Sequence, residues 1–416
     1  MNKGFYSVMA AEFFSSLADN ALLIVAIALL SQMQAPAWMT PLLRLFFVMA
    51  YVGLAAFVGA FADTLPKGKV MFITNTVKFV GCALIFVGVH PLAAYAIVGI
   101  GAAAYSPAKY GILTELLPAE KLVIANGWIE GLTVTSIILG TVLGGTLINQ
   151  HVAEFLQANI PFAYTSAIAA LIVIMFIYIL AALFNLRIPD TGARYEKQPT
   201  NPILLVKNFS KSFVTLWQDK LGQISLSVTT LFWGAGATLQ FIVLKWAQSA
   251  LGLTLDKAAF LQGIVAVGVA TGAVSAAKFI KLQHSLRVMP LGVAMGLVVM
   301  IMTQVHSVWI AYPLLIIVGG FAGFFVVPMN ALLQHRGHVL LSAGHSIAVQ
   351  NFNENLSILT MLGLYSLLIS LDLSVNAVIV IFGSFVALMM VGVIMWHRYN
   401  QKIQDSLHLI GEEKRH

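Results

Sequence analysis

Cysteine and charge are both scarce in this sequence of 416 residues. The single cysteine, Cys82, excludes a disulfide scaffold and any redox chemistry that needs a cysteine pair. Charged residues make up only 9% of the chain, against roughly 25% in soluble domains, while 59% of the residues are hydrophobic. Too few charges remain to cover a water-soluble surface of this size. The composition therefore excludes a soluble globular enzyme.

The hydrophobic residues form blocks of about 20 residues, the length at which an α-helix crosses a ~30 Å hydrocarbon core. The blocks predict spans at 9–31, 42–62, 70–89, 92–116, 122–148, 162–186, 224–250, 257–279, 286–305, 309–334, 342–370 and 373–396. We therefore expect an all-α polytopic membrane protein with 12 transmembrane helices in two six-helix bundles. The expected parts are an N-terminal bundle (1–186), a cytoplasmic linker (187–223), a C-terminal bundle (224–396) and a cytoplasmic tail (397–416).

The basic residues are distributed unequally over the two sides of this arrangement. Of the 23 lysines and arginines, Arg44, Lys245 and Lys257 fall on one side, Lys78 and Lys109 lie within spans, and the other 18 fall on the opposite side. Because lysine and arginine concentrate in cytoplasmic loops, both termini are predicted to be cytoplasmic. The basic residues do not gather on one soluble face, so nucleic acid is not an expected partner.

The two halves of the chain repeat one another, and a polar linker joins them. Gly59, followed by two lysines, is echoed about 213 residues later by Gly272, again followed by two lysines. Six spans plus six with a basic connection is the plan of a two-bundle transporter, which binds its substrate between the halves near the bilayer midplane. Within the linker, residues 204–217 are predicted to form an amphipathic surface helix.

Charged residues inside spans are informative because each costs about 2.5 to 3.5 kcal/mol unless it has a partner or a wet cavity. Asp19, with Asn20 beside it, falls near the middle of the first span, and we expect its partner to be a basic residue of the opposite bundle. Lys245 on the seventh span is the candidate. A pair between Asp19 and Lys245 that forms in one conformer and breaks in another is one hypothesis for a gate; a static ion pair or separate solvation are the alternatives.

Other polar residues share faces of the predicted spans. Tyr105 and Lys109 are one turn apart on the fourth span, and Lys109 is suited either to an anionic phosphate or to a structural bridge with Glu130 on the fifth. The eleventh span places two acidic or amide residues one turn apart and two more in the adjacent row, which implies water. The residues predicted to bind substrate are Asp19, Asn20, Tyr105, Lys109, Glu130, Trp233, Gln240, Gln350, Asn351 and Glu354.

Two further patterns have more ordinary interpretations. Asp63 and Lys67 flank a helix end beside basic loop residues, as in a cytoplasmic latch, and we include them with Asp19 and Lys245 as candidate gating residues. Pairs of glycines four residues apart pack spanning helices closely together. Such pairs occur at Gly140 and Gly144, Gly268 and Gly272, and Gly319 and Gly323.

Several motifs resemble those of known transporters. Gly59-x-x-x-Asp63 followed by Lys67-Gly68-Lys69 resembles the loop signature of the major facilitator superfamily, with one residue inserted and no basic residue directly after the aspartate. More specific are the segments FSSLADNALL (14–23), GIGAAAYSPAKYGIL (99–113), LFWGAG (231–236) and GFFVVPMNALLQ (323–334). Together with the segment AVQN (348–351) and the pair Glu354-Asn355, they resemble the bacterial lysophospholipid transporter family over nearly all spans. This resemblance implies the major facilitator fold.

The resemblance implies a flippase-like carrier that moves lysophosphatidylethanolamine and lysophosphatidylglycerol from the outer to the inner leaflet of the bacterial inner membrane. It also implies an acyltransferase partner that re-acylates them there, and no cofactor. Members of the family often carry an arginine on the seventh span where this sequence has Gln240. Lys245, five residues further on, is the candidate replacement.

The runner-up interpretation is a proton-coupled exporter of small amphipathic compounds that uses Asp19 or Glu130 as its titrating carboxylate. An enzyme is disfavoured because the sequence contains neither a His-x-x-x-x-Asp nor a His-Glu-x-x-His arrangement. A primary pump is disfavoured by the lack of Gly-x-x-x-x-Gly-Lys-Ser/Thr. No metal site is expected.

Overall fold

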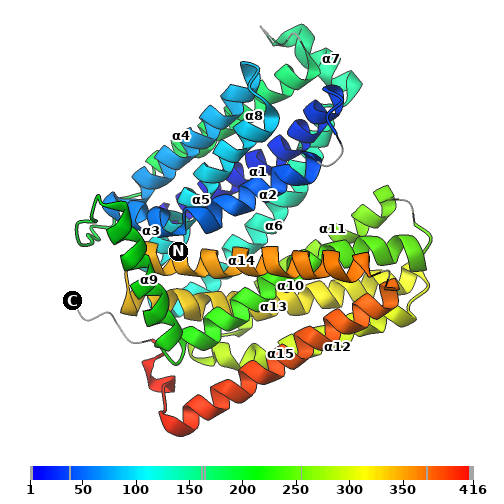
Figure 1. Ribbon diagram of the computed structural model, residues 1–416. Coiled ribbons are helices and arrows are strands. Elements are labelled where there is room, and N and C mark those ends of the chain that lie inside the picture. The colour runs from blue at the N-terminus through cyan, green and yellow to red at the C-terminus, as the bar shows by residue number, and fades with distance from the viewer. Residues whose placement is uncertain are drawn as a thin grey trace. The chain divides into compact units, whose positions relative to one another are not determined.

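The computed structural model describes residues 3–36, 39–160, 163, 165–253, 255–371 and 373–411, and these residues form α-helices without a strand (Figure 1). The helices are α1 (Lys3–Gln32), α2 (Met39–Gly53), α3 (Ala55–Thr64), α4 (Lys67–Phe86), α5 (Pro91–Leu116), α6 (Leu122–Leu147), α7 (Gln150–Asn159), α8 (Ser166–Leu186), α9 (Pro202–Gln218), α10 (Gly222–Ala250), α11 (Leu255–Phe279), α12 (Met289–Ile301), α13 (Val308–Leu340), α14 (Ala343–Ser370) and α15 (Val375–Ile403).

The expected membrane spans are confirmed. Among the described residues, 11 helices are long and apolar enough to cross a membrane, and the pair α2 and α3 brings the number to 12. That pair is bent by 67°, so the predicted span at 42–62 is a broken one. Helix α7 was not predicted, whereas α9 matches the helix predicted in the linker.

The chain divides into two compact units, each described by itself below. Unit 1 comprises Met1–Leu117, Thr135–Lys211 and Ser342–Val349, and unit 2 comprises Pro118–Val134, Ser212–Leu341 and Gln350–His416. The domain bounds expected from the sequence stay a prediction. Helix α6 begins in unit 2 and ends in unit 1, and α14 begins in unit 1 and ends in unit 2.

In unit 1, α1 and α4 both pack against α8, and α5 packs against α2 and α4. The predicted glycine strip on α6 is confirmed as a packing surface against α1. A Cβ atom on Gly140 would lie 2.6 Å from the carbonyl oxygen of Leu17, and one on Gly144 would lie 2.7 Å from that of Ala21. Only glycine permits these two backbones to approach so closely.

In unit 2, α11 packs along α13, and α12 packs along α15. The predicted strips on α11 and α13 face each other: a Cβ atom on Gly272 would collide with the carbonyl oxygen of Gly320, and one on Gly323 with that of Val269. Both glycine strips are therefore helix-packing surfaces, as predicted.

Trp246 is fully buried in the core, where its indole N–H donates to the carbonyl oxygen of Met302 over 2.9 Å.

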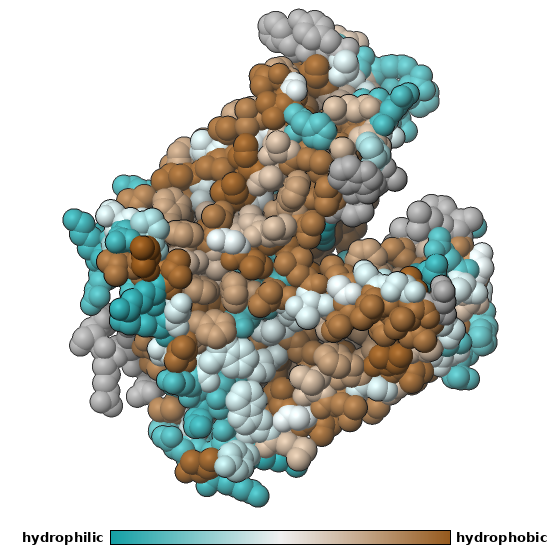
Figure 2. All heavy atoms as spheres, in the orientation of Figure 1, coloured by the Kyte–Doolittle hydropathy of each residue, from teal (hydrophilic) through white to brown (hydrophobic). Residues whose placement is uncertain are grey.

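Large hydrophobic side chains cover much of the outer faces of the helices, while hydrophilic residues gather near helix ends (Figure 2). Trp309 is 83% exposed and Leu388 is 70% exposed. In water such a surface would be unfavourable, whereas in a bilayer it contacts lipid chains.

Candidate functional site

Unit 1 contains four charged side chains, three of them buried and one, Asp19, partly buried, that form two ion pairs. Lys109 Nζ of α5 lies 3.0 Å from Glu12 Oε1 of α1, and Lys78 Nζ of α4 lies 2.7 Å from Asp19 Oδ2 of α1. Glu12 and Asp19 are seven residues apart, so they lie on one face of α1 two turns from each other. We call these four residues the charged quartet. Its formal charges cancel, which limits the cost of placing them inside a spanning bundle.

Each hydrogen bond around Lys78 and Asp19 can be assigned a donor and an acceptor. The ammonium group also donates to Ser15 Oγ over 2.9 Å, and a lysine can only donate. The hydroxyl of Ser15 therefore accepts from Lys78 and donates its own hydrogen bond to Asn75 Oδ1, 2.7 Å away. Tyr178 donates to the second oxygen of Asp19 over 2.7 Å. The carboxylate of Asp19 is thus held from two helices besides its own.

Two tyrosine rings lie beside the lysines of the quartet. Lys78 Nζ is 4.9 Å from the ring centroid of Tyr105, and Lys109 Nζ is 4.3 Å from that of Tyr110. Such cation–π contacts add to the neutralisation of each ammonium group. The hydroxyl of Tyr105 is buried and has no hydrogen-bond partner among the described residues.

The two ion pairs differ in which member is more accessible. The side chain of Asp19 is 14% exposed and that of Lys78 is 3% exposed. In the other pair the lysine is the more accessible member, because the side chain of Lys109 is 11% exposed and that of Glu12 is 5% exposed. The quartet therefore presents one carboxylate and one ammonium group, each backed by a buried counter-ion.

The partners in the quartet differ from those expected. Asp19 was expected to pair with a basic residue of the opposite half, but its partner is Lys78 of its own unit. Lys245 is exposed on α10, so its pairing with Asp19 stays a prediction. Lys109 contacts Glu12, which was not among the selected residues. The signal for these pairs was available, because the spans of the first half contain buried lysines and carboxylates that must neutralise one another.

Unit 2 contains a second polar cluster, built from amides and carboxylates, which we call the amide cluster. Asn330 of α13 donates to Glu130 of α6 over 3.2 Å and accepts from Gln350 of α14 over 3.1 Å. Gln350 also donates to Glu354 over 2.7 Å. Three helices are joined by this chain, and three of its four members were predicted substrate contacts.

A reciprocal amide pair lies on the same two helices, α6 and α13. Asn126 donates to Gln334 over 2.9 Å, and Gln334 donates to Asn126 over 2.8 Å. Both side chains are almost completely buried. Asn351, another predicted contact, is 7% exposed, and its carbonyl oxygen accepts from Asn355.

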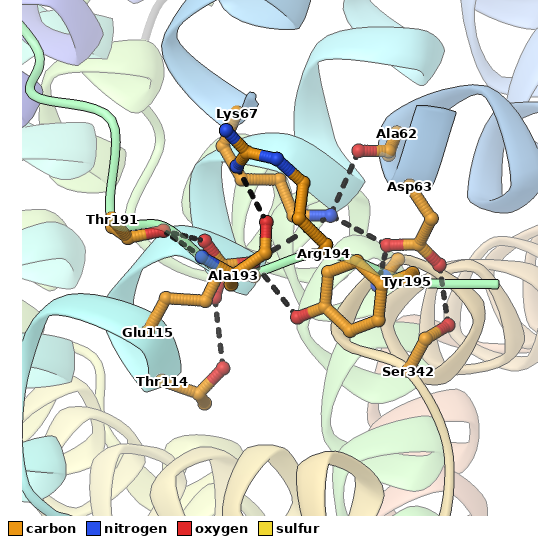
Figure 3. A network of polar contacts seen from close by, with 12 residues as sticks. Ala62, Asp63, Lys67, Thr114, Glu115, Thr191, Ala193, Arg194, Tyr195 and Ser342 are labelled. Carbon is orange, nitrogen blue, oxygen red and sulfur yellow. Dashed lines mark hydrogen bonds and ion pairs between the residues drawn. The ribbon is translucent and has the colours of Figure 1, made fainter. Parts of the chain in front are cut away.

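Asp63 and Lys67 form an ion pair at the junction of α3 and α4. Lys67 Nζ lies 2.5 Å from Asp63 Oδ1 and donates to the carbonyl oxygen of Ala62 over 2.8 Å (Figure 3). Asp63 also accepts hydrogen bonds from the hydroxyl of Ser342 and, over 3.1 Å, from the backbone N–H of Gly344. The carboxylate therefore occupies the N-terminus of α14, where unpaired N–H groups and the helix dipole favour an anion.

His345 completes this arrangement, which we call the latch. Its Nδ1 lies 3.0 Å from Asp63 Oδ2. The pairing of Asp63 with Lys67 follows from their spacing on adjacent helices, but the contacts with 342–345 join segments nearly 280 residues apart. No local pattern could have predicted the latter.

The sequence matches a known family of membrane transporters. Residues 8–357 match the family model of the Major Facilitator Superfamily. The "Lysophospholipid transporter LplT" of Citrobacter koseri is 44% identical over 399 residues, which cover 95% of this chain and 96% of that protein. The protein of the same name from Escherichia coli is 42% identical with the same coverage. The chain belongs to the lysophospholipid transporter family of the major facilitator superfamily.

Solved structures of major facilitator transporters share the fold at low sequence identity. The Escherichia coli fucose:proton symporter FucP superposes with a TM-score of 0.74 at 14% identity, covering 95% of this chain and 98% of that one. The human organic anion transporter MFSD10 gives a TM-score of 0.67 at 15% identity, covering 95% of this chain and all of that one. These proteins show the fold, and the members of the lysophospholipid transporter family show the kinship.

Three other residues predicted from the sequence have their described contacts outside the quartet and the amide cluster. Asn20 donates to the carbonyl oxygen of Ser16 within α1. Trp233 is half-buried and packs edge-to-face on Phe232, while Gln240 is exposed. Within the described residues, no group of three or more histidine, cysteine or acidic side chains is arranged to hold a metal ion.

Proposed function

We propose that this protein carries lysophospholipids across a membrane by alternating access. The observation that carries the proposal is the 44% identity to a protein named as a lysophospholipid transporter, which extends over 95% of this chain. The buried charges fit such a substrate, because a lysophospholipid has one polar head group that needs compensating charges in an apolar surrounding.

The charged quartet is the proposed site for the head group. A phosphate carries negative charge, and the ammonium group of phosphatidylethanolamine carries positive charge. Lys109 and Asp19 are the more accessible members of their pairs, so Lys109 is suited to the phosphate and Asp19 to the ammonium group. Each contact would use the accessible side of an ion pair that stays formed, so that Glu12 and Lys78 keep their opposite charges.

The remaining predicted contacts are proposed as secondary ones. Tyr105 has a buried hydroxyl without a partner in the described part of the chain, which suits it to a phosphate oxygen. The amide cluster can donate and accept hydrogen bonds without a net change of charge. The other proposed substrate contacts are Asn20, Glu130, Trp233, Gln240, Gln350, Asn351 and Glu354, and the proposed gating residues are Asp19, Asp63, Lys67 and Lys245.

The biological setting is proposed from the resemblance and from the distribution of basic residues. The substrates would be lysophosphatidylethanolamine and lysophosphatidylglycerol, moved from the outer to the inner leaflet of a bacterial inner membrane and re-acylated by an acyltransferase partner. The linker and both termini would lie in the cytoplasm, because that side carries 18 of the 23 lysines and arginines.

The test is uptake of labelled lysophosphatidylethanolamine by spheroplasts with and without the protein, repeated after collapse of the proton gradient. We expect protein-dependent uptake that survives the collapse. Labelled diacyl phosphatidylethanolamine, which has the same head group and a second chain, is the control substrate. Absence of uptake by folded, membrane-inserted protein would contradict the proposal. Uptake abolished by the collapse would favour proton coupling through a buried carboxylate.

A further inference from the structure

Two side chains of the linker between α8 and α9 donate hydrogen bonds to a buried carboxylate of unit 1 (Figure 3). Thr191 Oγ1 donates to Glu115 Oε2 over 2.7 Å, and the Tyr195 hydroxyl donates to Glu115 Oε1 over 2.8 Å. Glu115 belongs to the last turn of α5, and its side chain is 3% exposed. A carboxylate near a helix C-terminus is disfavoured by the helix dipole, so these two donors compensate for an unfavourable position.

The linker turn that presents these donors is held by its own contacts. Arg194 donates to both oxygens of Asp190 over 2.9 and 2.8 Å, and Asp190 accepts from the backbone N–H of Gly192 over 3.0 Å. Gly192 has φ of 78°, a conformation that favours glycine. The hydrogen bonds from Arg194 and Gly192 lower the pKa of Asp190 to about 2, so the turn stays closed at neutral pH.

Glu115 is a potential competitor for the lysine of the latch. Lys67 Nζ lies 2.5 Å from Asp63 Oδ1 but 3.8 Å from Glu115 Oε1. It also lies 4.6 Å from the ring centroid of Tyr195. The lysine is therefore placed between two carboxylates and prefers Asp63. The oxygens of Glu115 are already occupied by hydroxyl donors, which reduces its attraction for the ammonium group.

We propose that Thr191 and Tyr195 are positioning residues of the latch: they hold Glu115 so that Lys67 remains on Asp63, and Asp63 remains on the N-terminus of α14. We call this contact of the linker the clasp. Tyr195 also reaches α14 itself, because the backbone N–H of Ala343 hydrogen bonds to its hydroxyl. Burial, followed by the nearby Glu115, raises the pKa of Tyr195 well above its usual range, so it remains a donor. The proposal rests on the gating role of the latch and does not depend on the substrate.

The experiment measures how often α14 leaves the latch, by the rate of maleimide labelling of Ser346→Cys in the full chain with Cys82→Ser, in lipid nanodiscs. Ser346 is 1% exposed, and its hydroxyl has no hydrogen-bond partner among the described residues, so a thiol there removes no contact. We expect Tyr195→Phe to raise the labelling rate about tenfold, as expected for loss of one hydrogen bond to a carboxylate. Thr191→Val should raise it in the same direction. Tyr399→Phe, which changes a 63% exposed tyrosine on α15, should leave it unchanged.

The deciding variant is Glu115→Gln, because a neutral amide cannot compete for Lys67. Combined with Tyr195→Phe, it should return the labelling rate to within about twofold of that of Glu115→Gln alone. A tenfold effect of Tyr195→Phe that persists in the Glu115→Gln background would show that the tyrosine only packs, and would overturn the proposal. So would parent-like labelling in both Tyr195→Phe and Thr191→Val. No lysophospholipid is present, so the outcome is independent of transport.

Discussion

The charged quartet of unit 1 and the amide cluster of unit 2 hold their carboxylates in different ways. In the quartet, Glu12 and Asp19 each face a lysine at 3.0 Å or less, so both of these negative charges have a positive one beside them. In unit 2, the hydrogen bonds described for Glu130 and Glu354 come from amide groups over 3.2 and 2.7 Å. An ion pair requires both of its charges, whereas an amide can exchange one acceptor for another at little cost.

The difference assigns different tasks to the two clusters. Breaking an ion pair in an apolar bundle leaves both of its charges without a partner, so we expect the quartet to stay paired and to bind ligand charges at its accessible members, Lys109 and Asp19. A zwitterionic head group supplies both charges at once. The amide cluster can rearrange without such a ligand, because amides both donate and accept. We therefore expect the quartet to control substrate selection and the amide cluster to tolerate rearrangement.

The largest effect is expected from removal of one charge of the quartet. Lys78→Met leaves Asp19 buried without its ammonium partner and deprives Ser15 of a donor, which should lower stability by about 3 to 5 kcal/mol. Thermal unfolding of the purified protein in detergent measures this loss. The double variant Lys78→Met with Asp19→Asn should recover most of the stability, because no charge is then left unpaired. A double variant as unstable as the single one would contradict the ion-pair account.

The corresponding change in unit 2 should cost less. Asn126→Leu leaves the amide of Gln334 buried without its partner, which should lower stability by about 1 to 3 kcal/mol. The same unfolding measurement applies, and the double variant Asn126→Leu with Gln334→Leu is the control that removes both polar groups. A loss of stability as large as that of Lys78→Met would contradict the difference described between the charged quartet and the amide pair.

A smaller effect is expected when a carboxylate of the amide cluster becomes an amide. Glu354→Gln preserves an oxygen that can accept from Gln350, so stability should change by less than about 1 kcal/mol. Lysophospholipid uptake should nevertheless fall more than in Asp372→Asn, a change at a predicted span end that lies outside the described residues. Equal, negligible effects of the two changes on uptake would show that Glu354 is not part of the transport pathway.

The smallest effect concerns Lys245, the partner first expected for Asp19. Because Asp19 is already paired with Lys78, we expect the effects of Lys245→Ala and Asp19→Asn to be independent. The increases in the activation free energy of transport in the two single variants should sum to that of the double variant within about 0.5 kcal/mol. Initial uptake rates of the two single variants and the double variant give the comparison. A double variant no worse than Asp19→Asn alone would restore the hypothesis of a gate formed by Asp19 and Lys245.

Most of the fold could be predicted from the sequence, because span length and hydropathy are local properties. The blocks predicted at 122–148 and 162–186 match α6 and α8, and the glycine pairs mark the close contacts of α11 with α13. The bend between α2 and α3 was not predicted, although α2 ends at Gly53, a residue type that weakens a helix. Helix α7 is too short and too polar to give a span signal.

The candidate site was predicted in its residue types more than in its pairings. Asp19 and Lys109 stand out as charges within spans, but which lysine meets which carboxylate depends on the helices that adjoin α1. Lys78 was noted only as a basic residue within a span, although its position between α1 and α5 makes it the partner of Asp19. The clasp lies in the linker, where neither hydropathy nor a motif distinguishes Thr191 and Tyr195 from ordinary loop residues.

We expect the quartet to select the head group through its more accessible members, and a ratio of uptake rates measures this selection most directly. Lysophosphatidylethanolamine carries an ammonium group, whereas lysophosphatidylglycerol does not. Asp19→Asn should lower the uptake of the first relative to the second by about tenfold, the effect of losing one charge-assisted hydrogen bond. Glu12→Gln, which also leaves a lysine without its carboxylate, is the matched control and should change the ratio little. Equal ratios in the two variants and the parent protein would contradict the claim.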